Sequence, residues 1–185
     1  MKRKLLILSV LAICIATLTT GTLAFFTHEA KAHNVITTGG VEIAVKEWAD
    51  EKKTVPFKDL DGVMPGMKVT KIAEVKNTGS AAAWVRVKLE KKITLADKTA
   101  QPDPGLVILE LNTEDWTVKD GYYYYKEAVA PGETTAPLLK SVAFDTKMGN
   151  EYQNAKANVD VLAQAVQVAN NGKTIWEAKG WPSAD

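Results

Sequence analysis

The 185-residue sequence predicts an all-β fold, an antiparallel β-sandwich with few short helices. Three observations favour this fold class. Short segments alternate apolar and polar residues with a period of two, turn signals separate these segments, and no long amphipathic helix pattern interrupts them. Because many short antiparallel strands fill a chain of this length, we expect two packed sheets, and among sandwiches we expect a jelly roll.

Four segments carry the clearest strand pattern. In residues 84–90, three apolar side chains alternate with charged ones, so one face of this strand is predicted to lie on the core while Trp84 lies on the polar face. Residues 41–46 alternate in a similar way, and residues 107–111 and 139–144 are further strand candidates. Their lengths are typical of strands in sandwiches.

Turn signals connect these segments. Asp120-Gly121 separates residues 116–119 from residues 122–125, and this dipeptide tolerates the positive φ angles of a type I′ turn, so a β-hairpin is predicted. Pro65-Gly66 and Pro131-Gly132 have the composition of type II turns, each leading into a further strand candidate.

Residues 158–168 are long for a single strand. Their apolar phase slips between Val161 and Val166, which indicates a β-bulge. A helix is the alternative, because residues 163–165 are good helix formers and short apolar runs do not separate the two structures.

The N-terminus has the three parts of a secretory signal peptide. Basic residues 2–4 precede an apolar run over residues 5–18, and a small-residue exit ends at Ala24. We predict a signal peptide over residues 1–24, cleavage between Ala24 and Phe25, secretion, and membrane contact only before cleavage. A retained anchor needs about 20 continuous apolar residues, and threonines interrupt this run.

The predicted mature chain contains no cysteine, because Cys14 is the only one in the sequence. A disulfide framework and a cysteine zinc site are therefore excluded, so the domain depends on its hydrophobic core. Without the three basic residues of the signal region, 20 basic residues face 22 acidic ones, a balance that gives no reason to expect a nucleic-acid partner. We expect residues 25–36 to form a flexible arm and residues 37–185 a single sandwich domain.

The sequence predicts no catalytic residue, metal site or cofactor. His28 and His33 are five residues apart, whereas the zinc motif H-E-x-x-H needs a spacing of four to bring both imidazoles to one helix face. Residues 59–62 begin like a calcium loop but lack its later carboxylates, so a plain turn is the prediction.

The aromatic residues offer a candidate binding surface. Trp84, Tyr123 and Tyr125 are the candidate surface aromatics, which could stack on sugar rings or pack against another subunit. The alternative is ordinary core packing on one sheet face, with Tyr122 and Tyr124 on the opposite face from Tyr123 and Tyr125.

The order of several motifs resembles one family over nearly the whole chain. The N-terminal half contributes LAFFT at 23–27, TGGVEI at 38–43, VMPGMKV at 63–69, VKNTGS at 75–80 and WVRV at 84–87. The C-terminal half contributes GYYYY at 121–125, PGETT at 131–135 and AQAVQ at 163–167. Together they resemble the exported proteins processed by the SipW-type signal peptidase, the TasA, camelysin and CalY-like biofilm-matrix family.

This resemblance implies a Gram-positive surface or matrix protein with a jelly-roll fold, cleaved after Ala24 by a SipW-type peptidase. In fibre-forming members the released N-terminal segment pairs as a strand with the next subunit. For this chain, the resemblance implies a donor strand within residues 25–36. Its candidate residues are Phe25, Phe26, Thr27, Val35 and Ile36.

The sequence and this resemblance leave three hypotheses for the function of the protein. The first is a secreted structural protein that assembles into fibres, with itself or a related matrix protein as partner. The second is a camelysin-type secreted metallopeptidase, for which the sequence offers no recognised zinc motif. The third is a carbohydrate-binding or adhesion module that uses Trp84 and the tyrosine run.

Overall fold

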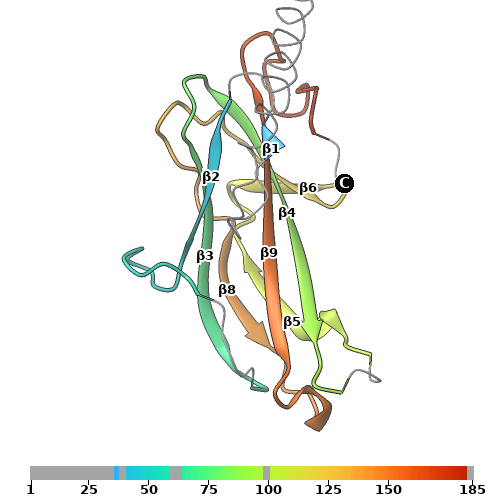
Figure 1. Ribbon diagram of the computed structural model, residues 1–185. Helices are drawn as coiled ribbons and strands as arrows, with labels where there is room; N and C mark the ends of the chain where they lie inside the picture. Colours follow the sequence, from blue (N-terminus) through green and yellow to red (C-terminus); the bar gives the residue numbers. More distant parts are fainter. Residues whose placement is uncertain (1–35, 38–40, 59–63, 98–100, 183–185) are drawn as a thin grey trace, which may run out of the picture. The chain divides into compact units, whose positions relative to one another are not determined.

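The computed structural model describes residues 36–37, 41–58, 64–97 and 101–182, which fold into two facing sheets (Figure 1). The five-stranded sheet has the order β1-β9-β4-β7-β6, formed by Ile36–Thr37, Lys156–Gln167, Ala83–Thr94, Tyr122–Tyr125 and Trp116–Lys119. The four-stranded sheet has the order β2-β3-β8-β5, formed by Ile43–Trp48, Lys68–Asn77, Leu139–Phe144 and Val107–Leu111. Two 3₁₀ turns, η1 (Pro104–Leu106) and η2 (Asn150–Tyr152), complete the described elements. The predicted all-β sandwich is confirmed.

The main core lies between the two sheets. Val85 and Val87 of β4 are at most 1% exposed, as are Val75 of β3 and Leu139 of β8 in the opposite sheet. Burying one such side chain stabilises the fold by roughly 1.5–3 kcal/mol. Trp116 is also buried, and its indole N–H donates to the carbonyl of Ala136 at 3.0 Å, so the indole enters the core with its polar atom satisfied.

The turns predicted at Gly66, Asp120-Gly121 and Gly132 are confirmed. Asp120 and Gly121 have φ angles of 51° and 78°, the two positive values of a type I′ turn, between β6 and β7. Gly66 and Gly132 have φ angles of 75° and 81°, as the third residue of a type II turn requires. The strands predicted at 107–111 and 139–144 match β5 and β8.

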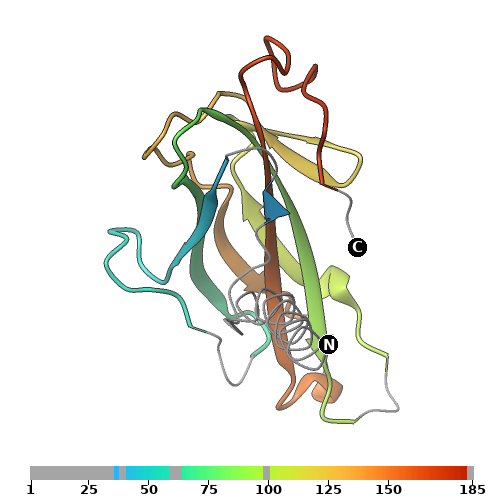
Figure 2. The same ribbon diagram turned by 45° about the horizontal axis from the view of Figure 1, so that its top comes forward.

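The predicted bulge in residues 158–168 is wrong, and so is the helical alternative. β9 pairs with β4 residue by residue from Lys156 to Gln167 without a register shift. The apolar phase slips because the outward-facing Val166 is also buried, in a second cluster with Ile175 of the C-terminal segment. Figure 2 shows this segment turning back toward the β6–β7 hairpin after β9.

β3 contains the irregularity that β9 lacks. Its register with β8 shifts between Thr70 and Ala73. The side chains of Lys71 and Ile72, within this shift, are both buried. The Lys71 side chain lies near the beginning of β9, beside Ala157 and Val159.

Candidate strand-acceptor edge

Three edges of the two sheets are short or occupied. On β2, the Glu47 carbonyl accepts from Phe57 N–H at 3.0 Å, so the following loop covers that position. On β5, the Val107 carbonyl accepts from Lys91 Nζ of β4 at 2.9 Å. This lysine occupies a backbone acceptor at the β5 edge, and a lysine at an edge opposes further pairing. The β6 edge offers only the four residues Trp116–Lys119.

The β9 edge is different. β4 pairs with β9 along one side over its whole length, but on the other side only Gln164 and Ala165 have a strand partner among the described residues. That partner is β1, which runs parallel and aligns Ile36 with Gln164. Among the described residues, 156–163 have no strand partner on this side, where β2 of the other sheet approaches β9, so their outward N–H and C=O groups are candidates for pairing with an added strand.

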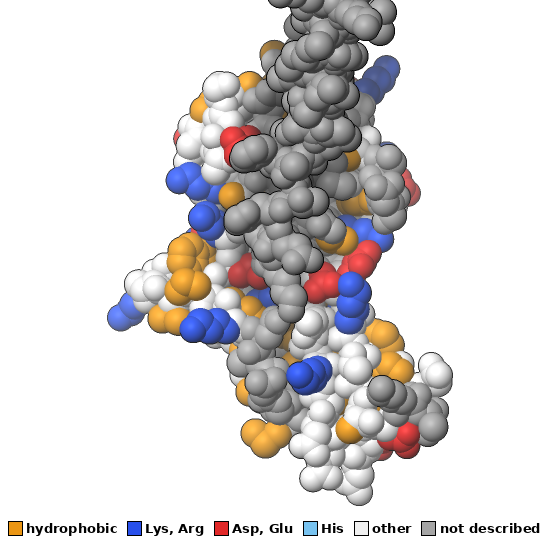
Figure 3. All heavy atoms as spheres, viewed as in Figure 1, with side chains coloured by type: hydrophobic (Ala, Val, Ile, Leu, Met, Phe, Trp, Pro, Cys, Tyr) orange, Lys and Arg blue, Asp and Glu red, His pale blue; other side chains and the backbone are white. Residues whose placement is uncertain are grey.

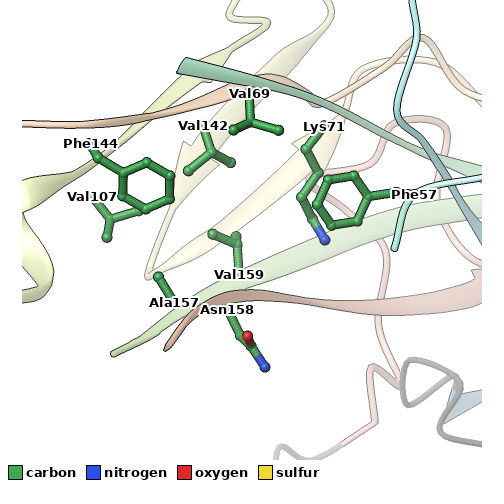
Figure 4. A pocket seen from close by; sticks show the side chains of 9 residues that line it. All are labelled: Phe57, Val69, Lys71, Val107, Val142, Phe144, Ala157, Asn158 and Val159. Carbon is green, nitrogen blue, oxygen red and sulfur yellow. The ribbon is translucent and has the colours of Figure 1, made fainter. Parts of the chain in front are cut away.

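A small apolar hollow, with free space of about 20 Å³, lies beside this stretch of β9 (Figure 4). One wall comes from β9, with Ala157, Asn158 and Val159. The other side is lined by Phe57, Val69, Lys71, Val107, Val142 and Phe144. A strand added to β9 would place alternate side chains over this hollow, because successive side chains point to opposite faces.

One ion pair is buried at the hollow. Lys71 Nζ lies 2.8 Å from Glu47 Oε1, and the two side chains are only 6% and 9% exposed. The Lys71 ammonium also lies 4.0 Å from the centroid of the Phe57 ring, a cation–π distance. The hollow is thus apolar, with the Lys71 ammonium on its wall paired to Glu47.

The loop after β2 holds Phe57 in this position. The Asp50 carboxylate accepts from the backbone N–H of Val55 at 2.7 Å, from that of Thr54 at 2.9 Å and from the Thr54 hydroxyl at 2.8 Å. These hydrogen bonds, that from Val55 first, lower the pKa of Asp50. Trp48 Nε1 donates to Glu74 at 3.0 Å, and Lys53 pairs with the same carboxylate, which holds the loop on the outer face of β3.

The same loop adds apolar surface next to the hollow. Val55 is 52% exposed, two residues from Phe57. In Figure 3, hydrophobic side chains gather on the flank that carries this loop, among Lys or Arg side chains. An incoming segment would therefore meet both apolar and basic groups here.

The prediction that Trp84 is a surface aromatic is wrong. Trp84 is 5% exposed and forms a second apolar cluster with Tyr124, Val166 and Ile175. Trp84 does lie on the outer face of β4, but the C-terminal segment covers that face. The alternation in residues 84–90 could not reveal this cover.

Tyr123 and Tyr125 are also not an exposed stacking row. Both are partly buried and pack against the main core, and the ring of Tyr125 lies 5.0 Å from that of Trp116. The alternative interpretation, core packing on one face, is the correct one for these two residues. Tyr122 and Tyr124 do lie on the opposite face, as predicted, where they join the second cluster.

Arg86 links this second cluster to the C-terminal segment. Its guanidinium lies 4.0 Å from the Tyr122 ring centroid and 4.7 Å from that of Trp181. It also donates to Gln164 at 2.8 Å and to the Pro182 carbonyl at 3.2 Å. Through these contacts the Arg86 guanidinium holds the C-terminal segment on the sheet, so Arg86 has a structural role.

Several predicted positions lie outside the described residues. They are the cleavage site Ala24 and Phe25, the donor residues Phe26, Thr27 and Val35, the arm histidines His28 and His33, and the turn at 59–62. Ile36 is described, and its backbone pairs with β9.

Within the described ranges, no group of three or more His, Cys, Asp or Glu residues is placed to hold a metal ion. In the same part of the chain, no helix has the length and apolar character needed to cross a membrane. Comparison of the chain with protein-family models, with curated proteins and with solved structures finds no match. The functional argument therefore depends on the sequence and on the β9 edge.

Proposed function

We propose that this chain is a secreted structural protein of a Gram-positive cell surface or biofilm matrix, which assembles into fibres by strand donation. After cleavage between Ala24 and Phe25 by a SipW-type peptidase, the arm of one copy adds to the β9 edge of the next. The observation that supports the proposal is that residues 156–163 of β9 have, among the described residues, a strand partner only on the β4 side, directly beyond the short pairing with β1.

The chemistry of the arm fits the hollow beside this edge. Residues 25–35 read FFTHEAKAHNV, so the arm combines apolar side chains with one Glu and one Lys. The hollow combines apolar walls with the side chain of Lys71, which pairs with Glu47. Backbone pairing supplies the affinity in such strand addition, and the side-chain pockets supply the specificity.

The geometry of donation explains why fibres form rather than closed dimers. The donor surface is the arm and the acceptor surface is the β9 edge, so the contact joins two different surfaces of the same chain. A heterologous contact whose rotation does not close generates an open filament. Cleavage would control this process, because before cleavage the arm is joined to the signal peptide.

We also propose that the sandwich is a jelly roll. The pairings of β3 with β8 and of β4 with β7 are nested along the chain, and the connections between β3 and β4 and between β7 and β8 pass from one sheet to the other. Nested pairings of this kind are expected when a long hairpin rolls into two sheets. The parallel pairing of β1 with β9 departs from a purely antiparallel arrangement.

Electron microscopy of two purified forms tests the proposal. One form begins at Phe25, and the other begins at Thr37 and lacks the arm. The proposal predicts fibres from the longer form and dispersed particles from the shorter one, with equal circular dichroism in fresh samples of both. Dispersed particles from both forms, or fibres from both, would contradict it.

A further inference from the structure

The C-terminal segment carries a half-exposed tryptophan whose position is fixed. Trp176 is 48% exposed, and its ring lies 5.3 Å from that of Tyr124 in the second cluster. Ile175 beside it is buried, and the Asn171 amide donates to the Lys179 carbonyl at 3.0 Å and accepts from the Lys179 N–H at 2.8 Å. The exposed indole is therefore held on a loop that hydrogen bonds and a buried side chain fasten in place.

Trp176 also lines an open hollow in this segment, with free space of about 480 Å³. The turn at residues 170–172 and residues 177–179 complete the lining. Gly172 has a φ of 86°, and a Cβ added there would lie 2.6 Å from the Cβ of Glu177, so glycine allows the turn to approach this side of the hollow. Sites for small molecules have volumes of about 300–1,000 Å³, and an open site also lets a longer chain cross it.

The polar groups of the hollow are suited to hydroxyl groups. The Asn170 amide both donates and accepts, and the Lys179 ammonium donates. Neither side chain has a hydrogen-bond partner in the part of the chain that the structure describes. Glu177 accepts from Lys173 N–H through Oε2 at 2.8 Å, a bond that leaves Oε1 as an acceptor. One acidic and one basic side chain line the hollow, so their charges balance.

We propose that this hollow binds an uncharged polysaccharide, with one hexose ring packed on the exposed part of the Trp176 indole. A hexose has an apolar C–H face that packs on an aromatic ring, and its hydroxyl groups both donate and accept hydrogen bonds. A cationic ligand would meet the Lys119 ammonium, which lies 5.9 Å from the centroid of the same ring. An anionic ligand would meet the Glu177 carboxylate, so the charges favour an uncharged ligand.

This site is separate from the acceptor stretch of β9. It lies in the C-terminal segment that follows β9 (Figure 2), and it uses none of residues 156–163, so it does not depend on strand donation. It also differs from the surface predicted from the sequence, because Trp84 is buried under this segment. If the subunits assemble into fibres, the hollow recurs in every subunit, and one polymer that engages several hollows gains avidity without a new contact.

Native gel electrophoresis of the freshly purified chain starting at Phe25 tests the proposal. Gels are cast with a dextran, a soluble β-glucan or a mannan at several concentrations, with alginate as an anionic comparison, and the retardation gives Kd. The proposal predicts retardation by at least one of the three uncharged polymers. Trp176→Ala should weaken this binding about tenfold, because it removes the aromatic face, and Trp176→Tyr should retain most of it. Ile108→Ala, at a side chain 49% exposed on β5, is the matched control and should bind as the unmodified chain does.

A second variant separates a lost contact from a lost fold, because Trp176→Ala also uncovers Tyr124. Asn170→Gly tolerates the φ of 60° at this position and removes only the free amide. It should weaken binding about fivefold, with an unchanged melting temperature. Equal binding by Trp176→Ala and the unmodified chain would overturn the proposal, as would no retardation by any uncharged polymer. Retardation by alginate alone, abolished by salt, would overturn the uncharged ligand class.

Discussion

Lys71 and Glu47 form an ion pair across β3 and β2, with Nζ and Oε1 2.8 Å apart and less than a tenth of either side chain exposed. Lys71 also lines the hollow beside β9. Lys71→Met removes the ammonium that pairs with the buried Glu47 carboxylate, so it should lower the free energy of unfolding by about 3–5 kcal/mol. Urea denaturation of the chain starting at Phe25 measures the change.

Two further variants give this prediction its controls. The double variant Lys71→Met with Glu47→Leu should recover most of the loss, because it removes both charges together. Lys92→Met breaks the exposed pair with Asp160, whose side chains are 63% and 39% exposed, and should lower the free energy of unfolding far less than Lys71→Met, because solvent screens exposed pairs. An equal loss from Lys71→Met and Lys92→Met would contradict the burial argument.

The C-terminal segment should be part of the cooperative fold. Ile175 is 3% exposed and lies in the second cluster with Trp84 and Tyr124. Ile175→Ala should therefore cost about 2–5 kcal/mol by thermal or urea unfolding. Val118→Ala, at a side chain 60% exposed, should stay within about 0.5 kcal/mol. A neutral Ile175→Ala would mean that the segment does not cover the sheet in solution.

The β6–β7 hairpin depends on backbone angles that few residues adopt. Gly121 has a φ of 78° and no neighbouring atom within 4 Å of an added Cβ, so Gly121→Ala meets only the backbone penalty. We expect a loss of about 1–2 kcal/mol in unfolding free energy. Asp120→Asn should be nearly neutral, because asparagine also tolerates the positive φ of 51° at this position.

The loop that carries Phe57 should respond to acid. The hydrogen bonds from Val55 and Thr54 lower the pKa of Asp50 below its ordinary value of 3.8. The contribution of the Asp50 carboxylate to stability is therefore fully present above pH 3.8. It is lost only as the pH falls through the lowered pKa. A carboxyl NMR titration should give a pKa below 3.8 for Asp50, and Asp50→Asn should loosen the loop at neutral pH. A pKa at or above 3.8 would show that these bonds do not form in solution.

Local chemistry explains which parts of the fold could be predicted. The β6–β7 hairpin followed from Asp120-Gly121, because those two residues determine the turn by themselves. The strands at 107–111 and 139–144 followed from short apolar runs between turn signals. None of these predictions needed knowledge of the neighbouring strands.

The second cluster could not be predicted, because its parts are distant in the sequence. Trp84 and Val166 face outward from the sandwich, and they are buried only because residues 170–182 return over that face. The same cover produced the apparent phase slip in β9. The ring of the half-exposed Trp176, in the same segment, lies 5.3 Å from that of Tyr124. The presence of this tryptophan near the C-terminus was the sequence feature that could have indicated an aromatic cover.

The acceptor edge likewise could not be predicted from the sequence. The motifs suggested a donor arm, but strand order decides which edge remains open, and pairings such as that of β9 with β4 join segments about 70 residues apart. Lys71 reads in the sequence as an ordinary polar position of β3. Only its burial beside Glu47 and Phe57 identifies it as part of the hollow.

Strand donation to β9 can be measured by hydrogen exchange in fibres and in monomer. Amides within residues 156–163 should gain protection on assembly, because a donated strand pairs with the side of β9 opposite β4. The β5 and β6 edges should exchange equally in both states. Fibres in which residues 156–163 exchange as in the monomer, with new protection at β5 or β6 instead, would contradict strand donation to β9.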